Sequence, residues 1–327
     1  MVHTEETLAR LTAIPELTVL PGAPLSQYTR FAIGGPADIY TETSSAEAFI
    51  AALHVARESG RDYVVIGGGT NLIVSDAGFR GIVLRFTAQR ILQAGDRVTA
   101  ESGALLQDLV DFTVARGLQG LETLAGIPGS VGAAVYGNAG AYGHSISERV
   151  RTVRFYDGRD VRVFDNDACE FQYRESIFKR HKDWIIFSTE LVLEPAGAAE
   201  LSKISGDIVA VRNQKFPVTM KCAGSIFKNL LLAELPSGLA ERVPARVIRE
   251  GKVPAAYFLE EVGAKGVTRG DIHVATYHAN LIYNGGTGTA ADLCAVIAEL
   301  KSRVEKRFGL TLEEEVQYVG FPDAARP

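Results

Sequence analysis

Short runs of β-branched and aliphatic residues, separated by turn residues, predict strands through the first two thirds of the chain. Val64-Val65-Ile66 ends at a triple glycine and Leu72-Ile73-Val74 follows it, which indicates a strand, a tight loop and a second strand. Asp157-Gly158 indicates a hairpin turn between two later strands. The remaining predicted strands cover residues 82–84, 97–100, 150–156, 161–164, 184–193 and 312–319.

Apolar residues at helical spacing predict helices between these strands. One helix is predicted from Leu105 to Arg116, where Gly117 ends it. Another ends before Pro217, and Pro254 is placed as the first residue of a third. The clearest helix follows Thr289, which approximates a capping box with Asp292, and its apolar stripe stops at Gly309. Interleaved strands and helices predict an α+β fold in more than one domain.

Composition and charge limit the class of protein. The 327 residues are 46% hydrophobic and 22% charged, which is ordinary for a globular chain long enough for two or three domains. A net charge of −5 argues against nucleic acid as the main partner. No stretch has the length and apolarity of a membrane span, and His3-Thr4-Glu5-Glu6 is unlike a signal peptide. Cys169, Cys222 and Cys294 are odd in number and far apart, so we expect reduced thiols, no metal site and a cytoplasmic location.

Two glycine-rich segments indicate backbone that closely approaches a ligand. Gly67-Gly68-Gly69-Thr70-Asn71 could present several N–H groups to a phosphate, although a plain glycine-rich turn explains it equally well. It is neither a Walker loop nor a Rossmann fingerprint, because the required Lys and the following helix are missing. Residues 126–143 are too apolar for a linker and too glycine-rich for an ordinary helix or strand. A flat ligand enclosed by backbone explains 126–143 better than dense interdomain packing.

Five segments in order along the chain resemble the UDP-N-acetylenolpyruvoylglucosamine reductase family of flavoenzymes. They are the two glycine-rich segments, residues 173–179 (Tyr-Arg-Glu-Ser-Ile-Phe-Lys), residues 223–229 (Ala-Gly-Ser-Ile-Phe-Lys-Asn) and residues 312–316 (Leu-Glu-Glu-Glu-Val). The resemblance spans about residues 28–321. It implies the vanillyl-alcohol-oxidase (PCMH) type of FAD-binding fold, followed by a C-terminal α+β substrate-binding domain.

The resemblance assigns FAD to the two glycine-rich segments. The implied cofactor-binding residues are Gly67, Gly68, Gly69, Thr70, Asn71, Gly126, Ile127, Pro128, Gly129, Ser130, Gly132, Asn138, Ala139, Tyr142 and Gly143. It also implies the domain limits: FAD-binding subdomain 1 over 1–85, with a strand at 311–327 returning to the active site, subdomain 2 over 86–212, and the substrate-binding domain over 213–310.

Arg174, Ser225 and Glu315 carry the catalytic roles that the resemblance implies. Taken alone, Arg174 would be a surface ion pair, Ser225 a structural turn residue and Glu315 part of a solvated charge run. In the family pattern the Arg174 guanidinium binds the enolpyruvyl carboxylate, for which its planar fork is suited. Ser225 protonates carbon, with no His-Asp pair beside it to suggest a triad. Glu315 is expected to be protonated or bridged to Arg174, because a bare carboxylate would repel the developing enolate.

Lys215, Lys228 and Asn229 are the implied substrate-binding residues. Lys215 and Asn229 match positions that contact the UDP diphosphate, although Lys215 is also explained as a lysine at a helix end. Lys228 could support the Ser225 alkoxide. His273 and His278 lack partners at metal-ligand spacing, and we give them a structural role.

The implied activity is reduction of UDP-N-acetylglucosamine enolpyruvate to UDP-N-acetylmuramate for peptidoglycan synthesis, with FAD as cofactor and NADPH as reductant, by a monomer. The chain departs from the family in three places: Leu230 replaces a common proline, Ala133 replaces a common glycine, and no insertion carries a substrate-covering tyrosine loop. It therefore resembles the shorter subclass. Two rival functions remain: an oxygen-using oxidase of the same FAD class and a non-enzymatic nucleotide-binding regulator.

Overall fold

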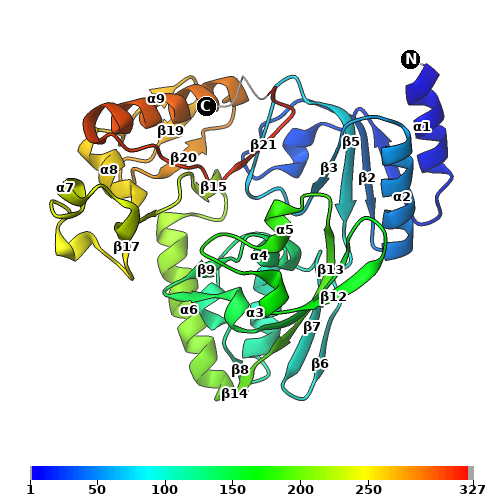
Figure 1. Cartoon of the computed structure of the whole chain (residues 1–327), viewed down its shortest axis with the longest axis horizontal. Coiled ribbons are helices and arrows are strands. Elements are labelled where there is room, and N and C mark those ends of the chain that lie inside the picture. Colours follow the sequence, from blue (N-terminus) through cyan, green and yellow to red (C-terminus); the bar gives the residue numbers. More distant parts are fainter. Residues whose placement is uncertain (1, 323–327) are drawn as a thin grey trace. The chain divides into compact units, whose positions relative to one another are not determined.

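A computed structural model describes residues 2–322, which group by their contacts into two compact units (Figure 1). Unit 1 comprises residues 2–23, 37–68 and 80–217, and unit 2 comprises residues 24–36, 69–79 and 218–322. Two short N-terminal segments therefore belong to the unit that the C-terminal third builds. The three-domain division at 1–85, 86–212 and 213–310 stays a prediction, and the end of its 311–327 strand lies outside the described residues.

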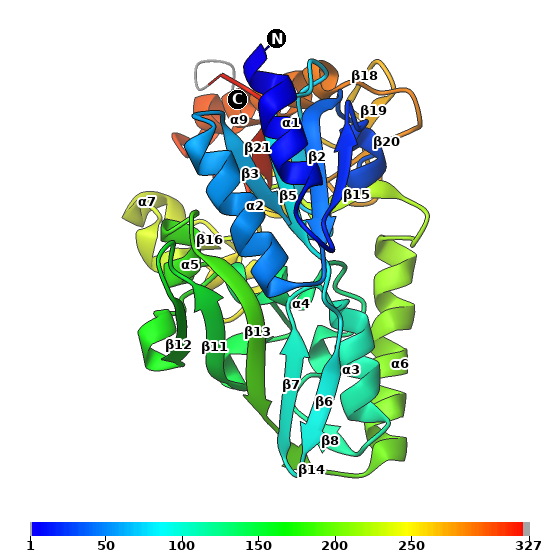
Figure 2. The same ribbon diagram turned by 90° about the vertical axis from the view of Figure 1, so that its right-hand side faces the viewer.

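The first sheet of unit 1 has the strand order β1–β2–β5–β3. Its strands are β1 (Thr18–Pro21), β2 (Ala37–Thr43), β3 (Tyr63–Ile66) and β5 (Phe79–Phe86), with β3 parallel to β5. Helices α1 (Val2–Thr12) and α2 (Ala46–Glu58) cover one face of the sheet (Figure 2). Phe49 and Leu53 of α2 are buried against Ile82 and Leu84 of β5. Ser45 begins α2 by accepting the N–H of Ala48.

The second sheet of unit 1 is antiparallel, with the strand order β12–β11–β13–β7–β6. Its strands are β6 (Ile91–Ala94), β7 (Arg97–Glu101), β11 (Val150–Tyr156), β12 (Val161–Asp165) and β13 (Ile185–Val192). The helices of this part are α3 (Leu106–Val114), α4 (Val131–Tyr136), α5 (Ile177–Arg180) and α6 (Ala198–Lys215). Helix α4 packs on β13 and β7, and α3 lies beside α6 (Figure 2). Two short strand pairs complete it: β8 (Leu118–Gln119) with β14 (Glu194–Pro195), and β9 (Gly140–Ala141) with β10 (His144–Ser145).

Unit 2 is built on an antiparallel sheet with the order β15–β20–β19–β18. Its strands are β15 (Lys221–Ser225), β18 (Thr268–Arg269), β19 (Ile272–Val274) and β20 (Leu281–Asn284). Two further pairs are β16 (Leu230–Leu231) with β17 (Lys252–Val253), and β4 (Leu72–Val74) parallel to β21 (Gln317–Val319). The helices are α7 (Ser237–Ala240), α8 (Ala255–Glu261) and α9 (Ala290–Phe308), and α9 contacts α8, β18 and β19.

Helix α9 begins and ends where the sequence predicts. Thr289 accepts the N–H of Asp292, and Gly309 ends the helix in the left-handed conformation, with φ of 68°. Asp76 supplies a cap that the local pattern does not reveal, because its two carboxylate oxygens accept the N–H groups of Ala290 and Ala291 at 2.8 and 2.9 Å. The segment 69–79 is thereby attached to the first turn of α9.

Three sequence-based element predictions are wrong in part. Residues 126–143 do contain a helix, α4, because Ser130 caps it and alanines follow. Pro254 lies one position before α8 as its N-cap, with ψ of 130°. The predicted strand at 312–319 is formed only over Gln317–Val319, because the chain changes its pairing partner. Glu314 makes an isolated bridge with Phe227, and the strand that follows pairs with β4.

Two features are absent from the described residues. No helix among them combines the length and the apolarity needed to cross a membrane. No cluster of three or more His, Cys, Asp or Glu side chains within 2–322 could hold a metal ion.

Candidate active site

The start of the first glycine-rich loop packs against the second glycine-rich segment, within unit 1. A Cβ added at Gly67 would lie 3.0 Å from Ser130 Oγ and 3.7 Å from Ala133 Cβ. Ser130 is buried and its Oγ accepts the N–H of Ala133. The two segments therefore meet without room for a larger side chain at Gly67, and Ala133 is compatible with that packing.

Gly69 has a structural reason for being glycine, which agrees with the plain-turn interpretation at this position. Its φ is +64°, and an added Cβ would lie 1.7 Å from the carbonyl oxygen of Tyr28. The N–H of Arg30 donates to the Gly69 carbonyl at 3.1 Å. The loop and the segment 24–36 are thereby fixed to one another in unit 2.

Both segments present main-chain donors that find no acceptor in the described part of the chain. The N–H groups of Gly68, Thr70 and Asn71 donate to no acceptor among residues 2–322, and neither do those of Gly129 and Ser130. Buried or half-buried donors of this kind need a partner, and successive N–H groups in a turn suit an anionic group. The donors of Gly68, Gly129 and Ser130, which all belong to unit 1, therefore fit the phosphate part of a dinucleotide such as FAD.

Three predicted site residues in unit 1 have strained or unusual backbone. Asn138, Tyr142 and Arg174 have φ of 42°, 54° and 58°, in the left-handed region that favours glycine. Asn tolerates this region, but for Tyr and Arg it costs free energy that the surrounding structure must offset. Strain at two residues that were selected for their chemistry supports a functional interpretation of this part of unit 1.

The Arg174 side chain docks on the second glycine-rich segment. Its Nη2 donates to the Gly140 carbonyl at 2.9 Å and its Nη1 to the Asn138 carbonyl at 3.4 Å. Lys179 Nζ donates to the Arg174 carbonyl at 2.9 Å and pairs with Glu175 at 2.7 Å. Arg174 is therefore positioned from both its main chain and its side chain.

Ser225 and Glu315 are brought onto adjoining segments in unit 2. The N–H of Glu315 donates at 2.8 Å to the carbonyl of Ile226, the residue after Ser225. Asn71, at the end of the first glycine-rich loop, donates from Nδ2 to the Glu315 carbonyl at 2.8 Å, and its own carbonyl accepts the Gln317 N–H at 2.9 Å. The main chain at Ser225, Glu315 and Asn71 is therefore connected by hydrogen bonds that residues far apart in sequence provide.

The predicted substrate-binding residues all have partners within the chain. Lys215 is the last residue of α6, and its Nζ lies 5.1 Å from the Phe216 ring centre. Lys228 Nζ forms an ion pair with Glu313. Asn229 Oδ1 accepts the N–H of Ala255 at 3.4 Å. A substrate role for these residues stays a prediction, because a bound diphosphate would have to compete with these contacts.

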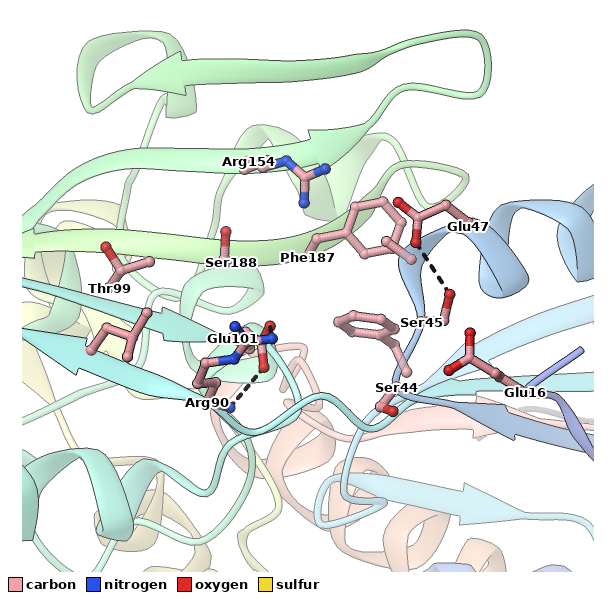
Figure 3. A pocket seen from close by; sticks show the side chains of 13 residues that line it. Glu16, Ser44, Ser45, Glu47, Arg90, Thr99, Glu101, Arg154, Phe187 and Ser188 are labelled. Carbon is pink, nitrogen blue, oxygen red and sulfur yellow. Dashed lines mark hydrogen bonds and ion pairs between the residues drawn. The ribbon is translucent and has the colours of Figure 1, made fainter.

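A cleft of about 430 Å³ lies on unit 1 (Figure 3). It is lined by both acidic and basic side chains, and several of them meet one another. Glu101 accepts the Arg90 N–H at 2.7 Å, and Ser45 Oγ donates to Glu47 at 3.1 Å (Figure 3). None of the sequence-predicted site residues lines this cleft, so we do not take it as the active site.

Sequence reasoning missed the residues that hold the site segments in place. Asn280 is only 2% exposed and bonds the main chain of Phe227, while Asp76 caps α9. The available signal was a lone Asn beside an apolar strand, a place where a buried amide needs partners.

Comparison with known proteins now decides the family. A reductase described as "UDP-N-acetylenolpyruvoylglucosamine reductase" from Solibacter usitatus is 68% identical over 311 residues, which is 95% of this chain and 100% of that protein. This chain belongs to the UDP-N-acetylenolpyruvoylglucosamine reductase family. A reductase of the same description from Rubrobacter xylanophilus is 38% identical, over 91% of this chain and 94% of its own.

Other comparisons agree with membership of the reductase family. The family "UDP-N-acetylenolpyruvoylglucosamine reductase, C-terminal domain" matches residues 216–319, and the family "FAD binding domain" matches residues 37–163. The crystal structure of the reductase from Thermus caldophilus superposes with a TM-score of 0.71 at 28% identity, covering 93% of this chain and 98% of that one. The predicted α+β fold class and the FAD-binding domain are thereby confirmed.

Proposed function

We propose that this protein reduces UDP-N-acetylglucosamine enolpyruvate to UDP-N-acetylmuramate, with NADPH as reductant and FAD as cofactor. The observation that carries the proposal is the 68% identity over the full length of a relative named for this reductase. The unused N–H groups of the glycine-rich segments support the FAD part of it. A cytoplasmic location and a monomeric state belong to the same proposal.

Each proposed catalytic residue has one task on the substrate. Bound FAD would supply the hydride for the terminal vinyl carbon, with NADPH as the source of the electrons. Arg174 binds the substrate carboxylate through its fork of N–H donors, and Glu315 stabilises the charge that develops there. Ser225 donates its hydroxyl proton to the carbon next to the carboxylate, so that the alkene becomes a lactyl ether.

The main-chain donors of the two glycine-rich segments would hold the FAD diphosphate. Those of Gly68, Gly129 and Ser130 all belong to unit 1. Each can donate one hydrogen bond, and charge-assisted bonds to phosphate are stronger than neutral ones.

The direct test follows NADPH consumption at 340 nm when the purified protein meets the enolpyruvyl sugar nucleotide. Substrate-dependent loss of absorbance, with a product two mass units heavier, supports the proposal. Rapid reoxidation of the reduced protein by air with no reaction of the sugar nucleotide would favour an oxidase. A colourless protein that cannot be reconstituted with FAD would favour a regulator.

Ser225→Ala separates the assigned roles. NADPH should still bleach the flavin at the wild-type rate, because Ser225 takes no part in that step. Reoxidation by the enolpyruvyl substrate should slow by roughly 10²–10⁴-fold, the usual contribution of a general acid. Ser237→Ala, at the exposed start of α7, is the control and should change neither rate. Equal slowing of both half-reactions in anaerobic stopped-flow absorbance would overturn the assignment.

A further inference from the structure

The strand that carries Ser225 is irregular just before this residue. Strand β15 pairs with β20 at Cys222 and again at Ser225, with a register shift between them, and Gly224 has φ of 80°. A bulge of this kind turns a strand and re-aims the side chain that follows. The hydrogen bonds between β15 and β20 therefore do not set the position of Ser225 by themselves.

The chain just after Ser225 is held mainly by one buried side chain. Asn280 Oδ1 accepts the Phe227 N–H at 2.9 Å, and Asn280 Nδ2 donates to the Phe227 carbonyl at 2.9 Å. The main-chain carbonyl of Asn280 accepts the Ile226 N–H at 3.1 Å. A single residue thus satisfies both main-chain groups of Phe227 and the donor of Ile226.

The opposite edge of the same short segment faces the glutamate run. Glu315 N–H donates to the Ile226 carbonyl at 2.8 Å and Lys228 N–H donates to the Glu313 carbonyl at 2.9 Å. Residues 226–228 therefore lie between Asn280 on one side and Glu313–Glu315 on the other. A shift of Phe227 would therefore disturb the segment that joins Ser225 to the Glu315 main chain.

We infer that Asn280 is a positioning residue for proton transfer, acting through the main chain at 226–228 to fix Ser225 relative to Glu315. The inference rests on the proposed function of those two residues. It assigns Asn280 no contact with substrate or cofactor. Its effect should fall on the half-reaction that uses Ser225, because a displacement of about 1 Å in a catalytic group can cost on the order of 10²-fold in rate.

Asn280→Asp tests this with little change of shape. The carboxylate keeps an acceptor for the Phe227 N–H, but an oxygen replaces the Nδ2 donor opposite the Phe227 carbonyl. Reoxidation by the enolpyruvyl substrate should slow by about 10–100-fold. Bleaching by NADPH should stay within about twofold of wild type, because that step does not use Ser225.

Asn284→Asp is the matched control, because Asn284 sits four residues further along and is also buried, at 3% exposure. Its Nδ2 donates to the Phe31 carbonyl at 2.9 Å, and its Oδ1 accepts the N–H groups of Gly286 and Gly288. The same chemical change therefore removes one donor at each site. Asn284→Asp should lower the unfolding temperature comparably and leave the ratio of the two half-reaction rates unchanged.

The outcomes separate this inference from the proposed function. If Ser225→Ala does not slow reoxidation selectively, the assignment of Ser225 fails whatever Asn280 does. If Ser225→Ala is selective and Asn280→Asp slows both half-reactions equally, or no more than Asn284→Asp, the inference alone is overturned. Should Asn280→Asp fail to bind FAD, Asn280→Ser replaces it, since a hydroxyl serves only one of the two Phe227 groups. Selective slowing of reoxidation is again expected, and its absence overturns the inference.

Discussion

Gly69→Ala should destabilise the protein far more than an ordinary glycine replacement. Two effects add at this position. Alanine in the left-handed region costs roughly 1–2 kcal/mol relative to its preferred conformations. The new Cβ would also lie 1.7 Å from the Tyr28 carbonyl oxygen, so the backbone must move by more than an ångström.

That movement has its own cost. It breaks the 3.1 Å hydrogen bond from Arg30 N–H to the Gly69 carbonyl, worth about 0.5–1.5 kcal/mol. Overpacking of a close contact adds about 1–3 kcal/mol. We therefore expect Gly69→Ala to lower the free energy of unfolding by about 3–6 kcal/mol and to weaken FAD binding, because Gly68 and Thr70 move with it.

Gly263→Ala isolates the conformational part of the effect. Gly263 lies in the same unit with φ of +68°, and nothing lies within 4 Å of an added Cβ. It should cost only about 1–2 kcal/mol. Urea unfolding followed by circular dichroism gives the two free energies, and FAD titration gives the affinities. Equal destabilisation by the two variants would refute the packing argument at Gly69.

Two further predictions concern unit 2. Asp76→Ala should remove two bonds from the first turn of α9 and cost about 1–3 kcal/mol, seen as roughly 5- to 150-fold faster hydrogen exchange at the start of that helix, with Asp76→Asn intermediate. Exchange that is unchanged in Asp76→Ala would contradict the cap. The hydrogen bond from His273, followed by those from Thr287, lowers the pKa of Asp271 to about 2. Its stabilising effect is therefore complete above about pH 4 and is lost as the pH falls through about 2. The difference in urea midpoint between wild type and Asp271→Asn should shrink over that window, and a constant difference would be evidence against the assignment.

Local patterns in the sequence predict much of the fold because their causes are local. Thr289 and Gly309 delimit α9 through contacts within one turn, and the alternation in 150–156 marks a strand whatever its partner. The strand predicted at 312–319 was too long, since its limits depend on a change of pairing partner from 226–228 to β4. Long-range partners leave no periodic trace in a sequence.

The residues of the candidate site also differ in whether their causes are local or long-range. The glycine-rich segments and the family resemblance selected residues whose backbone is unusual, such as Tyr142 and Arg174. The residues that hold the main chain at Phe227 and the first turn of α9 were not selectable, because Asn280 acts across 53 positions and Asp76 across 214. A short polar side chain gives no sign of the distant main chain that it will bond.

Unit 2 combines early and late segments of the chain, and this has a consequence for biosynthesis. Residues 24–36 and 69–79 leave the ribosome early, yet the rest of their unit begins only at residue 218, including the partners of Phe31 at Asn284 and of Ile73 at Tyr318. At roughly 5–20 residues per second, these apolar stretches wait on the order of ten seconds or more for translation to supply them. Unit 1 can fold on the nascent chain before residues 218–322 are complete. Unit 2 must assemble late, because its segments come from both early and late parts of the sequence.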